Sequence, residues 1–205
     1  MSSLTVITPA ESHDLTALET VKTELGLADS ISEDEKILNC IHQASGAIED
    51  YCGRVFAQET VSESWRLPYA PGEIVALKRI PVTEIISVTE VDTLLTADTQ
   101  YEFDSRTGFM WRLSNDARTC WTTGRLVVVY TAGYELLDQL PYAIERACIS
   151  LVKFYRAKSH QDPLLRSEEI PGVMRYDYQI NTIGSDGGLP PDVLSLLEPY
   201  RTLMA

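Results

Sequence analysis

The sequence has few of the residues from which metal and redox sites are built. It contains four cysteines and three histidines in 205 residues, and no two cysteines form a C-x-x-C pair. No histidine lies at ligand spacing from a cysteine, so neither a zinc site nor a cofactor is expected. The cysteines are predicted to be free thiols in a reducing compartment. They are Cys40, Cys52, Cys120 and Cys148.

Long apolar runs are also missing. No stretch approaches the ~18 consecutive apolar residues that a membrane-spanning helix needs. The N-terminus shows neither the basic nor the apolar region of a secretory signal. We therefore expect no membrane partner, and the length suits one domain or two small ones.

Positive charge is scarce. The chain has 17 lysines and arginines against 30 aspartates and glutamates, a net charge of −13. Residues 1–57 alone hold ten acids and three bases, a net of −7. Phosphate binding needs Lys and Arg, so the charge argues against a surface that grips nucleic acid. It does not exclude a surface that DNA slides past.

Catalytic motifs are absent as well. There is no G-x-S-x-G, and acidic neighbours such as Glu33–Glu35, Glu49–Asp50 and Glu168–Glu169 have no patterned partner. The first of these groups is better explained by helix capping, and chance pairs are expected in so acidic a chain. The sequence therefore predicts no catalytic residues, and a carboxylate-dependent hydrolase remains a lesser alternative.

Two helices are predicted in the first third of the chain. Each starts at a capping box, Thr16–Glu19 or Ser32–Glu35, in which a hydroxyl is followed three residues later by Glu. Glycines end them at Gly26 and Gly53. The second helix has apolar residues on one face. They are Ile37, Leu38, Ile41, Ala44, Ala47, Ile48 and Tyr51.

The helical period disappears between about residues 60 and 130, where short β-type runs alternate with turn signals. The close spacing of these runs favours hairpins over βαβ units. The expected strands are Val61–Leu67, Glu73–Lys78, Glu84–Val91, Tyr101–Phe103, Phe109–Leu113 and Arg125–Tyr130.

Helical periodicity returns at Pro141 and is lost again over residues 159–190, with a candidate strand at Val173–Ile180. A last short helix is predicted from Pro191 to about Leu203. The expected fold is α+β: a helical bundle with an inserted small antiparallel β module and an extended C-terminal arm. The expected domains are 1–158, a helical core with its β insertion at about 60–130, and 159–205, an arm with a short terminal helix.

The stretch "VVVYTAGYELLDQLPYAIERA", Val127–Ala147, joins a strand through a glycine turn to a helix. A phosphate loop needs several glycines and usually a Lys-Ser/Thr pair, whereas this stretch has one glycine and two acids in its turn. We interpret it as a structural joint. The joint residues are Gly53, Arg54, Tyr130, Gly133, Tyr134 and Pro141.

Two segments are candidates for contact with a partner. The first is a basic set, which could meet DNA or an acidic neighbouring subunit: Arg146, Lys153, Arg156 and Lys158. A solvated helix face is the more common explanation of such a set. A subunit interface is the preferred functional interpretation, with Arg146, Lys153 and Arg156 as its candidate residues. Ser167–Asn181 is rich in apolar and aromatic residues, so it either folds back on its own domain or adds to a partner. Its candidate contact residues are Ile170, Val173, Met174, Tyr176, Tyr178 and Ile180.

The order of these motifs resembles that of the head–tail connector, or neck adaptor, proteins of tailed bacteriophages and gene-transfer-agent-like particles. The resemblance covers roughly Leu15 to Arg156. It is carried by "TALETVKTELGL", "SEDEKILNCIHQASGAIEDYCGR", "IPVTEIISVTEV", a Tyr-x-Phe-Asp…Gly strand pair, and "VVVYTAGY" leading to "LPYAIERACISLVKFYR". The later "LPPDVLSLLEPYR" is similar to the longer members.

The resemblance implies a structural protein and not an enzyme. Such proteins form a ring, usually of twelve copies, below the portal protein in the virion neck, after assembly in the host cytoplasm. They extend the channel, through which double-stranded DNA passes without specific binding, and present a platform for stopper or tail-completion proteins. A C-terminal segment commonly reaches the portal or an adjacent subunit. The alternatives are a stopper or tail-completion protein of the same neck, the hydrolase, or a cellular interaction domain.

Overall fold

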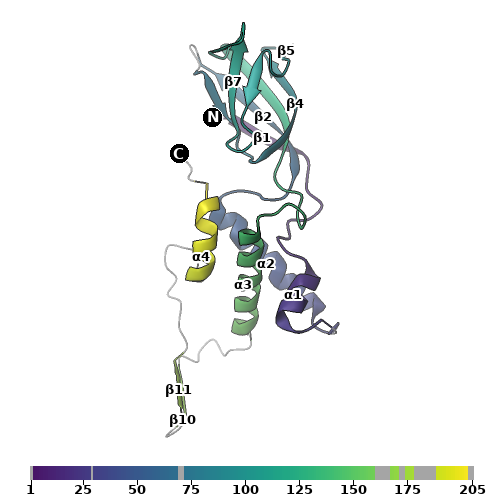
Figure 1. The fold of residues 1–205 in the computed structure, drawn as a ribbon, viewed down its shortest axis with the longest axis vertical. Helices are drawn as coiled ribbons and strands as arrows, with labels where there is room; N and C mark the ends of the chain where they lie inside the picture. The colour runs from purple at the N-terminus through teal and green to yellow at the C-terminus, as the bar shows by residue number, and fades with distance from the viewer. Residues whose placement is uncertain are drawn as a thin grey trace. The chain divides into compact units, whose positions relative to one another are not determined.

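The computed structural model describes residues 2–28, 30–68, 72–159, 167–170, 174–177 and 188–202. The chain divides into two units (Figure 1). The β unit comprises Met1–Ser12 and Val55–Glu135, and the helical unit comprises His13–Arg54 and Leu136–Ala205. The predicted α+β class is confirmed. No helix among the described residues has both the length and the apolar character to cross a membrane.

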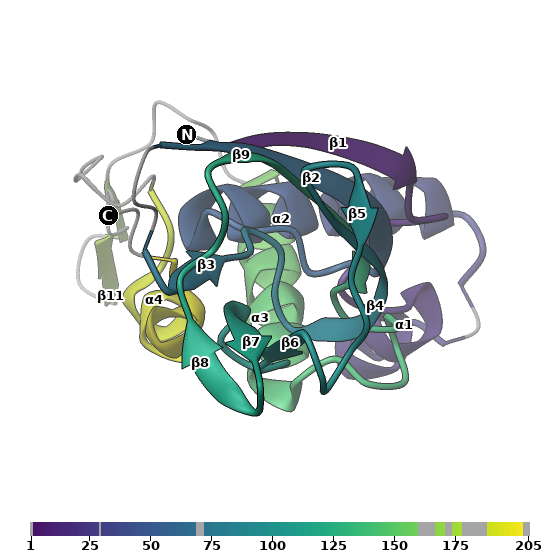
Figure 2. The same cartoon turned by 90° about the horizontal axis from the view of Figure 1, so that it is seen from above.

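Two antiparallel sheets make up the β unit. The larger has the order β1-β2-β9-β4-β5; the smaller has the order β3-β7-β6, with β8 paired to β7. Figure 2 shows β3, β6 and β7 on the concave side of the larger sheet. The strands are β1 Ser2–Thr8, β2 Glu59–Leu67, β3 Ile74–Ala76, β4 Val82–Glu90, β5 Thr93–Leu94, β6 Tyr101–Phe103, β7 Phe109–Ser114, β8 Ala117–Thr119 and β9 Gly124–Ala132.

The β core lies between these sheets because their central strands alternate buried and more exposed residues. In β9, Leu126, Val128 and Tyr130 are fully buried, and the residues between them are only partly so. Val75 and Met110 of the smaller sheet belong to the same buried cluster. Apolar side chains from two facing sheets thus form one core.

The β unit is a larger part of the fold than the predicted insertion. The six predicted strands are all present, and β1, which is not among them, pairs with β2 along its length. Its partner lies about 60 residues further on, so no local signal revealed it. The predicted domain limits of 1–158 and 159–205 stay a prediction.

The helical unit contains α1 Leu18–Leu25, α2 Asp34–Cys52, α3 Tyr142–Ser159 and α4 Pro191–Leu197, which continues as the 3₁₀ turn η1 Glu198–Tyr200. α3 packs against α2 and α4. Gly26 and Gly53 end α1 and α2 in the left-handed conformation, with φ of 67° and 64°, as predicted. The terminal helix is shorter than the predicted span to Leu203.

The two predicted capping boxes are wrong, although the helices are right. Ala17, which has no side-chain acceptor, is the N-cap of α1, and the Thr16 hydroxyl donates to Glu145 Oε1 of α3 at 3.5 Å. Glu33 is the N-cap of α2, and its carboxylate accepts from Arg156 and Lys36 instead. A tertiary partner has thus taken the Thr16 hydroxyl, and the Ser32 hydroxyl pairs with that of Ser30 at 3.4 Å.

A third pairing lies in the predicted arm. β10 Ser167–Ile170 and β11 Met174–Asp177 form an antiparallel hairpin, in which Ile170 is opposite Met174. β11 falls within the predicted strand Val173–Ile180.

A buried carboxylate ties the larger sheet together. Glu63 of β2 is fully buried and accepts hydrogen bonds from Tyr130 Oη at 3.0 Å, Ser2 Oγ at 2.5 Å and Lys78 N at 3.1 Å. Burial, and then the negative charge of Glu63, raises the pKa of Tyr130, so its hydroxyl keeps the proton that it donates. The arrangement satisfies a carboxylate that would otherwise be costly to bury.

We expect Tyr130→Phe to lower the free energy of unfolding by about 1–3 kcal/mol, because Glu63 would lose a buried hydrogen bond. Urea denaturation followed by circular dichroism measures the loss. Tyr142→Phe is the matched control, because Tyr142 is 88% exposed. Equal stability losses in the two variants would contradict a specific role for the buried hydroxyl.

Candidate functional site

The joint predicted at Gly133 is a close crossing of two chain segments in the β unit. The backbone N–H of Gly133 donates to Pro81 O at 2.9 Å, and that of Tyr134 donates to Phe56 O at 2.7 Å. Gly133 has a φ of 109°, and a Cβ at this position would overlap the carbonyl group of Ala57. The turn is therefore filled by backbone, and two of its N–H groups are already used inside the fold, so they cannot cradle an anion.

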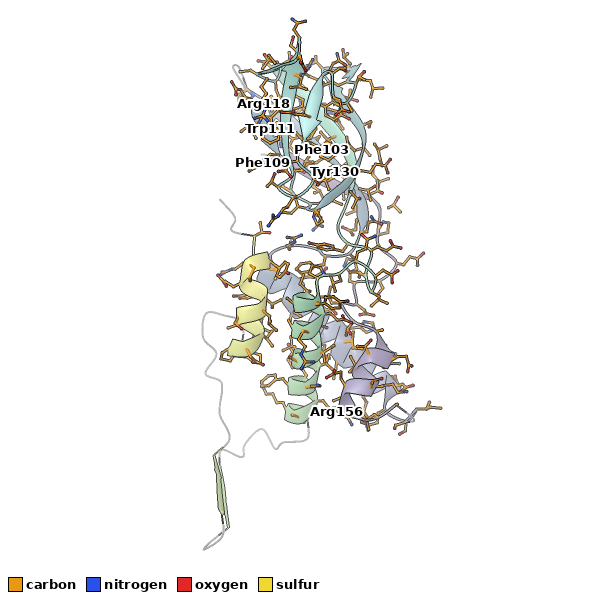
Figure 3. All side chains as sticks on the ribbon, viewed as in Figure 1. Phe103, Phe109, Trp111, Arg118, Tyr130 and Arg156 are labelled. Atoms are coloured by element: carbon orange, nitrogen blue, oxygen red, sulfur yellow. The ribbon has the colours of Figure 1, made fainter. Side chains whose placement is uncertain are left out.

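The other joint residues lie at chain turns and in the core. Arg54 N donates to Glu49 O just after the Gly53 cap of α2. The carbonyl of Pro141 accepts from the N–H groups of Ile144 and Glu145 at the start of α3. Tyr130 lies in the β core (Figure 3).

The three predicted interface cations of α3 bind acids of their own chain. Arg146 Nη1 and Lys153 Nζ lie 3.2 and 2.6 Å from Glu24 Oε2 of α1, and Arg156 Nη2 lies 2.7 Å from Glu33 Oε2. The hydrogen bond from Lys153, followed by its charge and by Arg146, lowers the pKa of Glu24. These pairs connect α3 to the acidic N-terminal part, and a subunit interface at this face stays a prediction.

The candidate partner-binding residues fall in and around the hairpin. Ile170 is in β10, and Met174 and Tyr176 are in β11. The structure describes only the backbone pairing of these three residues. Val173, Tyr178 and Ile180 lie outside the described residues. Their contacts with a partner stay a prediction.

Acidic groups elsewhere are engaged in structural pairs. Asp14 and Glu49 bind the side chains of His42 and His13 at 2.6 and 3.4 Å. No group of three or more His, Cys, Asp or Glu residues among those that the structure describes could hold a metal ion.

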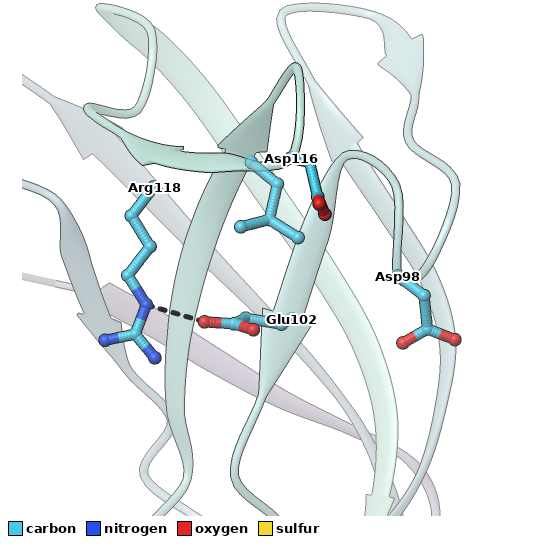
Figure 4. A pocket seen from close by; sticks show the side chains of 5 residues that line it. Asp98, Glu102, Asp116 and Arg118 are labelled. Atoms are coloured by element: carbon cyan, nitrogen blue, oxygen red, sulfur yellow. Dashed lines mark hydrogen bonds and ion pairs between the residues drawn. The ribbon is translucent and has the colours of Figure 1, made fainter.

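One open pocket of about 320 Å³ lies on the smaller sheet and is lined by Asp98, Glu102, Leu113, Asp116 and Arg118 (Figure 4). Arg118 Nε donates to Glu102 Oε1 at 2.6 Å, so one carboxylate of the pocket is neutralised within the chain. The other carboxylates of the lining are those of Asp98 and Asp116.

An aromatic group next to this pocket was missed by the sequence reasoning. Phe109 and Trp111 meet edge to face at 6.3 Å, and the Arg118 guanidinium lies 4.3 Å from the Trp111 ring centre (Figure 3). Phe109 and Ile74, on paired strands, are exposed. Alternation in "FMWRL" indicates which residues face outward, but the contact of Arg118 with Trp111 depends on strand pairing.

The thiols are consistent with a structural role. Burial raises the pKa of Cys52 to about 11 and that of Cys148 to about 12. Cys148 Sγ lies 3.7 Å from Ser45 Oγ in the helical core. All four cysteines are free, as predicted.

Comparisons with known proteins cover nearly the whole chain. A protein-family model described as HCP, head completion protein, matches residues 14–203. Among curated protein sequences, none matches significantly.

Solved structures show the same fold at low sequence identity. A chain from the neck of an empty gene transfer agent (GTA) particle, computed with sixfold symmetry, is 21% identical with a TM-score of 0.59, over 99% of this chain and 97% of that one. A chain from the neck of the native GTA particle, with twelvefold symmetry, is 18% identical with a TM-score of 0.58, over the same shares. A chain from the native GTA virion is 19% identical with a TM-score of 0.60, over 98% and 96%.

Gly133→Ala is expected to lower the free energy of unfolding by about 2–4 kcal/mol, because the added methyl group strains the backbone and meets the Ala57 carbonyl. Gly46→Ala is the matched control: Gly46 lies within α2, and nothing lies within 4 Å of an added Cβ. That variant should gain about 0.5–1 kcal/mol from helix propensity. Chemical denaturation measures the free energy of unfolding of both variants. Unchanged stability in Gly133→Ala would contradict the close packing of Gly133 against Ala57.

Proposed function

Because this chain belongs to the head completion protein family, we propose that it is a structural adaptor of a virion neck. In this proposal, copies form a ring under the portal protein, extend the DNA channel, and present a platform for stopper or tail-completion proteins. Assembly takes place in the host cytoplasm. The proposed ring has twelve copies, in agreement with the twelvefold symmetry of the neck of the native GTA particle.

The observation that carries this proposal is the family match over residues 14–203. The fold supports it, because it is similar over almost its full length to chains in GTA particle necks that have sixfold or twelvefold symmetry. The family description fits a structural role and not an enzymatic one. The open pocket with its internal ion pair adds no support for the hydrolase alternative.

Two surfaces would make the contacts. The α3 face with Arg146, Lys153 and Arg156 is suited to an adjacent subunit, because Arg146 and Lys153 keep 56% and 35% of their side chains exposed while bound to Glu24. The segment from Ile170 to Ile180 would reach the portal protein or a neighbouring copy, with its hairpin backbone offering strand edges for pairing.

Charge supports passage of DNA without adhesion. The chain carries −13, and the α3 cations Arg146, Lys153 and Arg156 are each paired with an acid of their own chain. Proteins bind DNA strongly when their Lys and Arg side chains replace the cations condensed on the phosphates. Cations that are already paired with acids replace few of them, so such a surface binds DNA weakly. Double-stranded DNA would therefore move through the channel without a specific site.

Imaging tests the proposed position directly. Purified protein is mixed with DNA-filled, portal-bearing particles that lack neck proteins, and the vertex is reconstructed by electron microscopy. The expected result is a ring of density directly below the portal, with C-terminal segments touching it. Binding that requires another neck protein first would identify a stopper or tail-completion protein instead. Absence of binding under both conditions would reject the neck assignment.

A pair of variants separates the two roles of the α3 face. Lys153→Gln and Glu24→Gln both remove the Lys153–Glu24 ion pair, and Glu24→Gln also removes the pair with Arg146. Because these pairs are exposed, both variants should leave thermal stability almost unchanged. Only Lys153→Gln removes a cation from the proposed interface, so only it should lower ring occupancy on particles. Equal occupancy for the two variants would contradict a subunit contact through Lys153.

A further inference from the structure

We propose that neighbouring copies in the ring exchange their N-terminal strands, so that β1 of one copy pairs with β2 of the next. The inference rests on the proposed ring and adds the means by which its subunits are linked. It assigns the partner of β1 in the assembly as a second copy of this chain, with the same strand register as in the single chain.

The path of the chain makes β1 a natural strand for exchange. By its contacts, β1 belongs to the β unit, but residues 13–54 of the helical unit separate it from the rest of that unit. Its covalent connection to the rest of the fold therefore runs through Pro9–Ser12 into the helical unit. β1 is held in the β unit solely by noncovalent contacts, which an identical copy can supply equally well.

The strand is lightly held. Of its seven residues only Ser2 and Leu4 are partly buried, and the other five are exposed, including Val6 at 38% and Ile7 at 54%. Apart from the backbone pairing with β2, the described polar contacts of β1 are those of Ser2. The Ser2 hydroxyl donates to Glu63, and the Ser2 carbonyl accepts from Lys78 Nζ at 3.3 Å. Because β1 buries little apolar area, its release costs mainly the backbone pairing with β2 and the contacts of Ser2, all of which a second copy restores.

Removal of β1 from the edge of β2 would raise the free energy of the β unit. Without the strand, Glu63 would lose the Ser2 hydroxyl, and the edge of β2 would present unpaired backbone groups. Any copy whose own β1 has left is therefore stabilised by accepting another β1. Each copy gives one strand and receives one, which is a head-to-tail contact of the kind that closes into rings.

Charge favours β1 as the exchanged segment. The strand reads SSLTVIT and has no ionisable side chain, whereas residues 1–57 as a whole carry a net of −7. Copies of so acidic a chain repel one another, and a neutral strand can enter the neighbouring copy without adding to that repulsion. At the opposite edge of the sheet, β5 pairs with the end of β4, and β4 itself contains Glu84 and two register irregularities in its pairing with β9. These features discourage strand addition there.

Engineered disulfides test the exchange. Ser3 and Ser64 are paired across β1 and β2, so Ser3→Cys/Ser64→Cys places two thiols opposite each other, in a Cys120→Ser background that removes the exposed native thiol. The variant is oxidised both as free chain and as ring on portal-bearing particles, and then run on a denaturing, non-reducing gel. Exchange predicts covalent ladders of two or more chains from the ring, which collapse to single chains on reduction.

The control pair is Ser62→Cys/Val129→Cys, which joins β2 to β9. Both strands lie within the continuous segment 55–135, so this disulfide must stay within one chain whether or not β1 is exchanged. As a second measurement, Ser3→Cys chains are mixed with Ser64→Cys chains before assembly. A disulfide between position 3 of one chain and position 64 of another, identified by peptide mapping of the dimer, shows that β1 of one copy meets β2 of another.

The outcomes separate the two proposals. Rings that form but yield only cross-links within single chains overturn strand exchange and leave the neck assignment intact. Ladders from the Ser3/Ser64 variant, with single chains from the control pair, support exchange. If no ring forms on the particles, the proposed function fails and this inference fails with it.

Discussion

The β unit depends on a buried negative charge that three chain segments satisfy together. Glu63 lies in the centre of β2, and its donors come from β9, from the segment after β3, and from the N-terminal strand. An unpaired carboxylate is costly inside a protein, so the fold is most stable when all three donors are in place around Glu63. The same requirement fixes the register of β1, since a shift by one residue would turn Ser2 away from Glu63.

The helices and most of the strands could be predicted because their signals are local. Apolar spacing indicated α2 and α3, glycines marked the ends of α1 and α2, and turn residues separated the strands. The first capping box failed because the Thr16 hydroxyl binds α3, more than 120 residues away. In the second, the Ser32 hydroxyl pairs with Ser30, and the N-cap is Glu33. β1 was missed because a short, uncharged strand is recognisable only beside its partner β2.

The sequence was sufficient to predict the general class of the protein, but not the partners of the individual side chains. The order of motifs indicated a neck protein, and the family match supports the general assignment. The sequence marked Lys153 and Arg156 as a positive face, but it could not show that Glu24 and Glu33 already bind them. The stacking of Arg118 on Trp111 escaped notice because strand pairing, not spacing along the chain, brings the two side chains together.

The chain path also limits how this protein can be recombined with its relatives. Residues 55–135 look like a cassette inserted between α2 and α3, ready to be transplanted as one piece. Grafted alone, the cassette would carry Glu63 and the bare edge of β2 but not the strand that completes them. A chimaera built from two family members must therefore inherit β1 and its central segment from the same parent, even though a whole helical segment separates them in the gene.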